Sequence, residues 1–115
     1  MIFRVDKLDS AAGARILKVI GPLTIQTLFD FQRVVREETT KPLIVDLSGV
    51  QYMDSAGLGC VIGAYTSCQR SQRAFAITGI SGRIRTLFAV TRVDGLIPCC
   101  DSLAAAEASV TASNI

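Results

Sequence analysis

Residues 43–63 read LIVDLSGVQYMDSAGLGCVIG, and this stretch decides the fold class. Its first five residues form a nearly continuous apolar run after Lys41-Pro42, which is typical of a strand buried on both faces of a sheet. From Ser55 the spacing of apolar residues changes to three and four, which predicts an amphipathic helix to about Gln72. The residues on its apolar side are Leu58, Val61, Ile62 and Tyr65. A buried strand followed by such a helix indicates an α/β protein.

Two strands and a helix are predicted upstream of this stretch. Residues 2–8 and 14–20 are short β-forming runs, and the turn-forming residues 9–13 between them predict an antiparallel hairpin. After Gly21-Pro22, apolar residues recur at the spacing of a helix, which we expect Thr24 to cap at its N-terminus. These apolar residues are Ile25, Leu28, Phe29, Phe31, Val34 and Val35.

The alternation of strands and helices continues downstream. We expect a strand over residues 74–78, a helix from Ser81, a short edge segment over residues 96–99 and a closing helix capped by Asp101-Ser102. The order ββαβαβαβα predicts a mixed, mostly parallel β-sheet of four to five strands with about four α-helices. We expect residues 1–115 to form a single domain.

The composition excludes several classes of function. The 115 residues carry a net charge of +2 and only 6% aromatic side chains, which argues against nucleic acid as a partner. The chain has no histidine, so it lacks the usual base of serine and cysteine hydrolases, and we expect no enzyme activity. No run approaches the roughly 18 apolar residues of a membrane span, so we expect no direct membrane insertion and a cytoplasmic location.

The cysteines do not indicate a metal site. Their spacing suits neither a zinc ribbon nor an ordinary disulfide, because no Cys-x-x-Cys pair occurs and two of them are adjacent. They are Cys60, Cys68, Cys99 and Cys100. We expect buried, reduced thiols and no metal ion.

Three glycines in the predicted helix raise the question of a nucleotide-binding loop: Gly57, Gly59 and Gly63. A dinucleotide-binding loop needs an acidic residue at the end of the next strand, where this chain has Thr78-Gly79. We therefore expect the glycines to let the helix approach the sheet closely, and we expect no cofactor. A small nucleotide-binding protein remains an alternative. A phosphoryl-accepting role for Asp46 is disfavoured, because no lysine follows Lys41.

Asp54-Ser55 lies where the predicted central strand ends and the helix begins. Asp and Ser oxygens accept hydrogen bonds from the free N–H groups of a first helical turn, so one of the two should cap the helix while the other can be exposed. The motif D-S-A-G-L-G at residues 54–59 resembles the STAS domain, specifically that of the bacterial anti-sigma factor antagonists. Residues 91–98 with Asp101-Ser102 are similar to the closing segment of that family, and residues 21–24 are similar to its turn before the first helix.

This resemblance implies a STAS-like fold and a regulatory switch without catalysis. In the family, the serine that matches Ser55 is phosphorylated by the anti-sigma factor, an ATP-dependent serine kinase. The unmodified antagonist binds that kinase and frees the sigma factor, whereas the phosphorylated one does not bind until a phosphatase acts on it. We expect a monomer or weak dimer.

The resemblance also implies which residues form the site. The helix cap and motif residues are Asp54, Gly57 and Gly59. The expected partner-binding residues are Gly21, Thr24, Thr27, Met53, Asp54, Ser55, Ala56, Leu58, Ser81 and Arg83. A phosphate on Ser55 would add about −1.5 to −2 charges beside the Asp54 carboxylate, which a bound partner would have to desolvate.

Three positions depart from the family pattern. Thr24 stands where many members have Asp, Ala56 replaces a second serine, and Arg92 replaces a glycine, which makes a left-handed turn harder to form there. A different function on the same fold is a scaffold in a stress-sensing complex, or a regulatory subunit of a lipid or anion transporter. For Arg83, Arg85 and Arg92, a solvated basic face and a partner surface both remain open.

Overall fold

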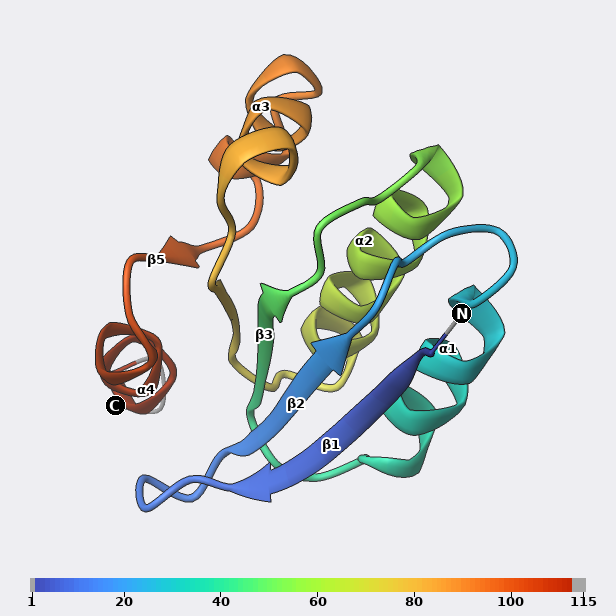
Figure 1. Cartoon of the computed structure of the whole chain (residues 1–115). Coiled ribbons are helices and arrows are strands. Elements are labelled where there is room, and N and C mark those ends of the chain that lie inside the picture. The colour runs from blue at the N-terminus through green and yellow to red at the C-terminus, as the bar shows by residue number, and fades with distance from the viewer. Residues whose placement is uncertain (1, 113–115) are drawn as a thin grey trace.

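One five-stranded sheet organises residues 2–112, the part of the chain that the computed structural model describes. The strands lie side by side in sequence order, and only the first pair is antiparallel (Figure 1). Their bounds are β1 (Arg4–Asp9), β2 (Arg15–Ile20), β3 (Leu43–Gly49), β4 (Phe75–Thr78) and β5 (Cys99–Cys100). The mixed, mostly parallel sheet predicted from the sequence is confirmed.

Helices pack on both faces of this sheet. Their bounds are α1 (Leu28–Glu37), α2 (Ser55–Arg70), α3 (Gly82–Val90) and α4 (Leu103–Ala112), and a short 3-10 helix, η1 (Val93–Gly95), follows α3. Helices α1 and α2 lie on one face and α4 on the other, while α3 lies beyond the upper end of the sheet (Figure 1). The predicted order ββαβαβαβα is confirmed, although element ends differ by up to three residues.

Strand β3 is the central strand, and it is buried on both faces as its apolar run predicted. Leu43, Ile44 and Val45 are all fully buried. Because side chains alternate along a strand, Leu43 and Val45 point into the core beneath α1 and α2, whereas Ile44 packs with Ala106 and Val110 of α4. The strand therefore holds the two layers of helices together.

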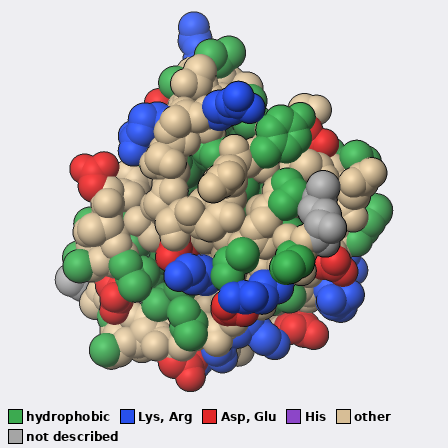
Figure 2. Space-filling model, viewed as in Figure 1, with side chains coloured by type: hydrophobic (Ala, Val, Ile, Leu, Met, Phe, Trp, Pro, Cys, Tyr) green, Lys and Arg blue, Asp and Glu red, His purple; other side chains and the backbone are tan. Residues whose placement is uncertain are grey.

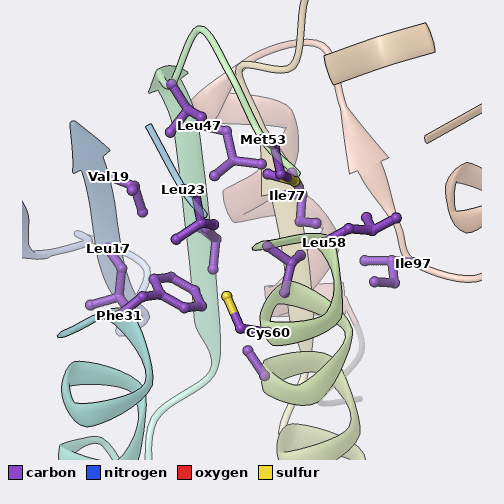
Figure 3. Packing of buried hydrophobic residues seen from close by; sticks show 14 of the residues in the cluster. Leu17, Val19, Leu23, Phe31, Leu47, Met53, Leu58, Cys60, Ile77 and Ile97 are labelled. Atoms are coloured by element: carbon purple, nitrogen blue, oxygen red, sulfur yellow. The ribbon is translucent and has the colours of Figure 1, made fainter. Parts of the chain in front are cut away.

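The larger core joins α1 and α2 to the sheet. In Figure 3, Leu17 of β2 and Phe31 of α1 lie on one side of β3, and Leu58 and Cys60 of α2 lie on the other. All four side chains are buried. This packing fixes the position of the first turn of α2, which carries the D-S motif.

Helix α1 begins at Leu28, three residues later than predicted, and Thr24 does not cap it. The Thr24 hydroxyl oxygen instead accepts a hydrogen bond from the Gln26 N–H at 3.2 Å, within a turn that precedes the helix. The apolar stripe that faces the core is consequently narrower than predicted: Leu28, Phe31 and Val35. Ile25 and Phe29, which were expected on that stripe, are exposed.

The cysteines are less uniformly buried than predicted. Cys60 and Cys68 are buried, but Cys99 and Cys100 are half-buried because β5 is a two-residue strand at the edge of the sheet. All four are free thiols. Burial raises the pKa of the Cys60 thiol to about 12, and it also raises the pKa of Cys68 and of Cys99. Raised thiol pKa values keep these side chains protonated and unreactive.

A cluster of charged side chains ties the lower end of the sheet together. The Glu38 carboxylate lies 3.0 Å from Nε of Arg15, and it accepts hydrogen bonds from the N–H groups of Thr40 and Lys41. Nη1 of Arg73 donates to the carbonyl oxygens of Glu38 and Lys41. The cluster therefore joins β2, the α1–β3 loop and the turn before β4.

Candidate functional site

Two loops meet at the carboxyl end of the parallel strands β2 and β3. The Leu23 N–H donates to the Tyr52 carbonyl oxygen at 3.0 Å, and the Asp54 N–H donates to the Leu23 carbonyl oxygen at 3.3 Å. Leu23 and Met53 consequently form a parallel bridge that extends the pairing of the two strands. Ligands and partners of open α/β sheets commonly bind beyond this end of the strands.

Asp54 is the N-terminal cap of α2 and also the link between the two loops. Oδ1 of Asp54 accepts a hydrogen bond from the Gly57 N–H at 2.8 Å, and Oδ2 accepts one from the Ile25 N–H at 3.1 Å. The hydrogen bond from Gly57, followed by that from Ile25, lowers the pKa of the Asp54 carboxyl. The carboxylate is therefore ionised at neutral pH, and both of its oxygens are occupied.

Ser55 is the first residue of α2 and is exposed. Because Asp54 provides the cap, the Ser55 hydroxyl is not needed for it. Within residues 2–112, no hydrogen bond or ion pair involves the Ser55 side chain. A free hydroxyl at a helix N-terminus, beside a fixed carboxylate, is accessible to a modifying enzyme.

Gly57 lies against the β2–α1 loop, whereas the other two glycines do not face the sheet. A Cβ on Gly57 would collide with the Leu23 carbonyl group. At Gly59 and Gly63 a Cβ would meet no atom within 4 Å, and Gly63 lines an open groove of about 210 Å³ between α1 and α2. The expectation that all three glycines allow close packing is therefore correct for Gly57 and wrong for Gly59 and Gly63, because their faces of the helix point to solvent.

Three of the expected partner-binding side chains are buried: Thr27, Met53 and Leu58. The Thr27 hydroxyl donates to the Pro22 carbonyl oxygen at 2.8 Å and accepts from the Thr24 N–H at 2.9 Å, so it closes the β2–α1 loop. Met53 and Leu58 belong to the main core. These three side chains therefore lie beneath the surface of the site and support its two loops.

The remaining expected residues reach the surface to different degrees. Gly21, Thr24 and Ala56 are half-buried, and Gly21 has a φ of +103°, which favours glycine. Ser81 and Arg83 are exposed at the start of α3, which follows β4 at the same end of the sheet. The structure therefore places Ser81 and Arg83 on a separate element from the Asp54 loops.

Basic side chains gather over α3 at the top of the face shown in Figure 2. Arg83 and Arg85 of α3 are exposed, as is Arg92 at the start of η1, and Arg85 donates a hydrogen bond to the Ile80 carbonyl oxygen. None of the ion pairs among residues 2–112 includes any of these three arginines or Asp54.

Exposed apolar side chains on and next to these two loops are a feature that the sequence pattern did not predict. Ile25, Phe29 and Tyr52 lie on or next to the two loops, and all three are exposed. The exposure of Phe29 follows from the helical repeat of 3.6 residues. In a helix that begins at Leu28 and buries Phe31, the side chain of Phe29 points to solvent. Because the predicted helix began three residues too early, Ile25 and Phe29 were both assigned to its buried side.

The described residues offer no metal-binding or membrane-spanning feature. No group of three or more Cys, Asp or Glu side chains in residues 2–112 could hold a metal ion. Over the same residues, every helix is too short or too polar to cross a lipid bilayer.

The comparisons with known proteins agree with the fold. Residues 5–106 match the STAS domain model, so the chain belongs to the STAS domain family. The anti-sigma-B factor antagonist of Staphylococcus aureus is 33% identical over 84 residues, which cover 70% of this chain and 78% of the relative. An anti-sigma factor antagonist from Mycobacterium paratuberculosis has a crystal structure with a TM-score of 0.85 at 20% identity, covering 95% of this chain and 94% of that one.

Within that family, the sequence is similar to the anti-sigma factor antagonists. The solved structure of the antagonist SpoIIAA in its unphosphorylated form also matches, with a TM-score of 0.61 at 16% identity over 90% of this chain and 91% of that one. The resemblance stated from the D-S-A-G-L-G motif is confirmed.

Proposed function

We propose that this chain is an anti-sigma factor antagonist that is switched by phosphorylation of Ser55. The unmodified protein binds an anti-sigma factor that is also a serine kinase, and binding releases the sigma factor. Phosphorylated Ser55 prevents this binding until a phosphatase removes the phosphate. The chain is a binding protein and a kinase substrate, with no catalysis of its own.

The observation that carries this proposal is the environment of the Ser55 hydroxyl. It is exposed at the first turn of α2, and it follows a carboxylate whose two oxygens already accept hydrogen bonds from Gly57 and Ile25. A kinase can reach the hydroxyl without unfolding the helix. The similarity to the Staphylococcus aureus antagonist supports the same class of partner.

We expect the phosphate to weaken binding of the partner and to leave the fold of this chain unchanged. A phosphoserine carries about −1.5 to −2 charges, and a helix N-terminus offsets about 0.3–1 kcal/mol of that repulsion from Asp54. A bound partner would have to remove water from the phosphate without a cation from this chain to pair with it. Weakening binding a thousandfold needs about 4 kcal/mol, which is within the cost of burying such a charge.

The test uses purified anti-sigma factors with kinase domains, taken as a panel from the genome that encodes this chain. We expect one of them, with ATP, to add a single phosphate to the wild type and none to Ser55→Ala, as measured by intact mass. Ser67→Ala is the matched control, because Ser67 is also an exposed serine on α2 and lies outside the expected partner-binding residues. It should accept one phosphate like the wild type.

Binding measurements then separate a switch from a scaffold. Isothermal titration with the same kinase should show tight binding of the wild type and at least hundredfold weaker binding of Ser55→Asp. Equal affinity of the two proteins would contradict the switch and would favour the scaffold or transporter-subunit function. A failure of every kinase in the panel to bind the wild type or to phosphorylate it would exclude the proposed function.

A further inference from the structure

Strand β1 forms one edge of the sheet, and its outer side has no partner strand. The strand order leaves β1 with β2 as its single neighbour among residues 2–112, and Figure 1 shows β1 at the border of the sheet. The chain ahead of β1 follows the same line, because the Ile2 carbonyl oxygen and the Cα of Phe3 lie against Gly21, next to the end of β2. Residues 2–9 therefore form one open edge, which we call the β1 edge. Such an edge presents free N–H and C=O groups that can pair with another extended chain.

The side chains of the β1 edge combine opposite charges with exposed apolar groups. Ile2 is 77% exposed and Leu8 is 47% exposed. Between them, Nε of Arg4 lies 3.3 Å from Oδ1 of Asp6, and both of these charged side chains reach solvent. Because side chains alternate along an extended chain, all four lie on the same face of the sheet. This face of the edge therefore carries a charged pair with an apolar residue on either side.

A second copy of this chain fits the β1 edge in one antiparallel register. A two-fold axis perpendicular to the sheet sets residues whose side chains share a face directly opposite each other. With the axis at Val5, Arg4 of each copy faces Asp6 of the other, so the dimer contains two ion pairs between the copies. The other pairs of this register are Ile2 with Leu8 and Phe3 with Lys7. The β1 edge is therefore complementary to itself in charge and in apolar surface.

The neighbouring registers are unfavourable. An axis at Arg4, Asp6 or Lys7 would set two identical charges directly opposite each other, which destabilises a pair of strands. An axis at Leu8 would carry the pairing into the hairpin turn that begins at Ser10, where the Gly13 N–H donates to the Ser10 carbonyl oxygen. The charges of β1 consequently discourage these pairings and select the register centred on Val5.

We propose that the β1 edge is a self-association surface, on which two copies of this chain pair antiparallel around Val5 and join their sheets into one. This inference goes beyond the proposed function and uses none of the residues expected to bind the anti-sigma factor. Strand β2 separates β1 from β3, so the Ser55 hydroxyl lies outside the paired edge. A pairing of two short edges buries little surface, and the dimer is therefore weak and forms at high protein concentration.

Sedimentation equilibrium tests this self-association. We expect the wild type to show a monomer–dimer equilibrium at concentrations up to about 1 mM. Arg4→Asp should weaken the dimer by about tenfold or more, because two pairs of carboxylates then face each other, and Asp6→Arg should do the same with two pairs of guanidinium groups. The combined variant Arg4→Asp with Asp6→Arg restores opposite charges and should return the dissociation constant to within about threefold of the wild type.

Arg92→Asp is the matched control, because it changes the net charge by the same amount at an exposed residue outside the β1 edge. Its dissociation constant should stay within about twofold of the wild type. Circular dichroism checks that each variant is folded. A wild type that stays monomeric at about 1 mM would overturn the inference. A dimer that Arg4→Asp leaves unchanged, or that the combined variant does not restore, would overturn it as well.

The proposed function is tested separately from this inference. Phosphorylation of Ser55 is measured by intact mass and does not require the dimer. A wild type that dimerises as described but accepts no phosphate and binds no kinase would support the self-association surface and exclude the proposed function. A monomeric wild type that is phosphorylated on Ser55 would leave the proposed function standing and remove the self-association surface.

Discussion

Gly57 and Gly59 belong to the same motif, but the surrounding atoms give them opposite roles. Gly57 allows the first turn of α2 to touch the Leu23 carbonyl group, whereas Gly59 faces solvent. A glycine in an exposed helix costs stability, because the unfolded chain loses more conformational freedom at glycine than at alanine. Gly59 therefore makes the folded protein less stable than an alanine at this position would.

Alanine substitutions distinguish these roles. Gly57→Ala should lower the free energy of unfolding by about 1–3 kcal/mol, because the new methyl group displaces the β2–α1 loop. Gly59→Ala should raise it by about 0.5–1 kcal/mol, since nothing opposes the added Cβ. Urea denaturation measures both values, with Gly63→Ala as a second exposed position expected to behave like Gly59→Ala. A loss of stability in Gly59→Ala would contradict the open surface at that residue.

Arg92 shows how a residue can accept a conformation that its type disfavours. It has a φ of 61° and a ψ of 20°, in the left-handed region, at the turn between α3 and η1. Glycine, which stands there in the family pattern, adopts this conformation without strain. The chain nevertheless forms the turn, because Val93 and Ile97 on its far side are buried in the core.

At the scale of the elements, a single carboxylate couples the β2–α1 loop to α2. Asp54 holds the Gly57 N–H with one oxygen and the Ile25 N–H with the other. An asparagine has one acceptor oxygen and can replace only one of these hydrogen bonds. The two functions of the residue can therefore be separated by substitution.

Amide hydrogen exchange of Asp54→Asn and Asp54→Ala tests this coupling. We expect Asp54→Asn to keep the Gly57 amide protected and to speed up exchange at the Ile25 amide, because the side chain retains the helix cap. Asp54→Ala should speed up exchange at both amides and should be the less stable of the two variants. Slow exchange at Ile25 in Asp54→Ala would mean that other contacts hold the loop.

At the scale of the whole molecule, Glu38 makes the free energy of unfolding depend on pH in the acidic range. Burial by itself raises the pKa of the Glu38 carboxyl, but hydrogen bonds from the N–H of Lys41, from Arg15 and from the N–H of Thr40 outweigh it and lower the pKa from 4.5 to about 2. A carboxyl with a lowered pKa in the folded state contributes stability above its unfolded pKa. That contribution is lost as the pH falls from 4.5 towards about 2.

Urea denaturation of the wild type and of Glu38→Gln tests this expectation. It is measured at neutral pH and at a pH between about 2 and 4.5, the folded and unfolded pKa values of Glu38. Glu38→Gln should be less stable at neutral pH and should lose less stability on acidification than the wild type. Glu37→Gln is the matched control, because Glu37 makes only an exposed ion pair with Lys7, worth about 0.2–1 kcal/mol at most. A wild type and a Glu38→Gln variant with the same pH dependence would show that Glu38 is not the group responsible.

Much of this molecule could be predicted from local patterns. The apolar run 43–47 predicted a strand buried on both faces, because only such a strand tolerates apolar residues in succession. The capping chemistry of Asp54-Ser55 predicted that one of the two would be free. The start of α1 could not be predicted in this way, since the hydrogen bonds of Thr24 and Thr27 within the β2–α1 loop replace the first turn of the expected helix.

The sequence by itself determined the order of strands and helices, the class of sheet and the motif that carries the exposed hydroxyl. These depend on the period of apolar residues and on the hydrogen-bonding capacity of side chains close to one another in the chain. Only the tertiary structure decided that the Asp54 carboxylate accepts a hydrogen bond from the N–H of Ile25, 29 residues away, and that Ile25 and Phe29 are exposed. The physical reason is that adjacent parallel strands bring their carboxyl ends together, whatever the length of chain between them.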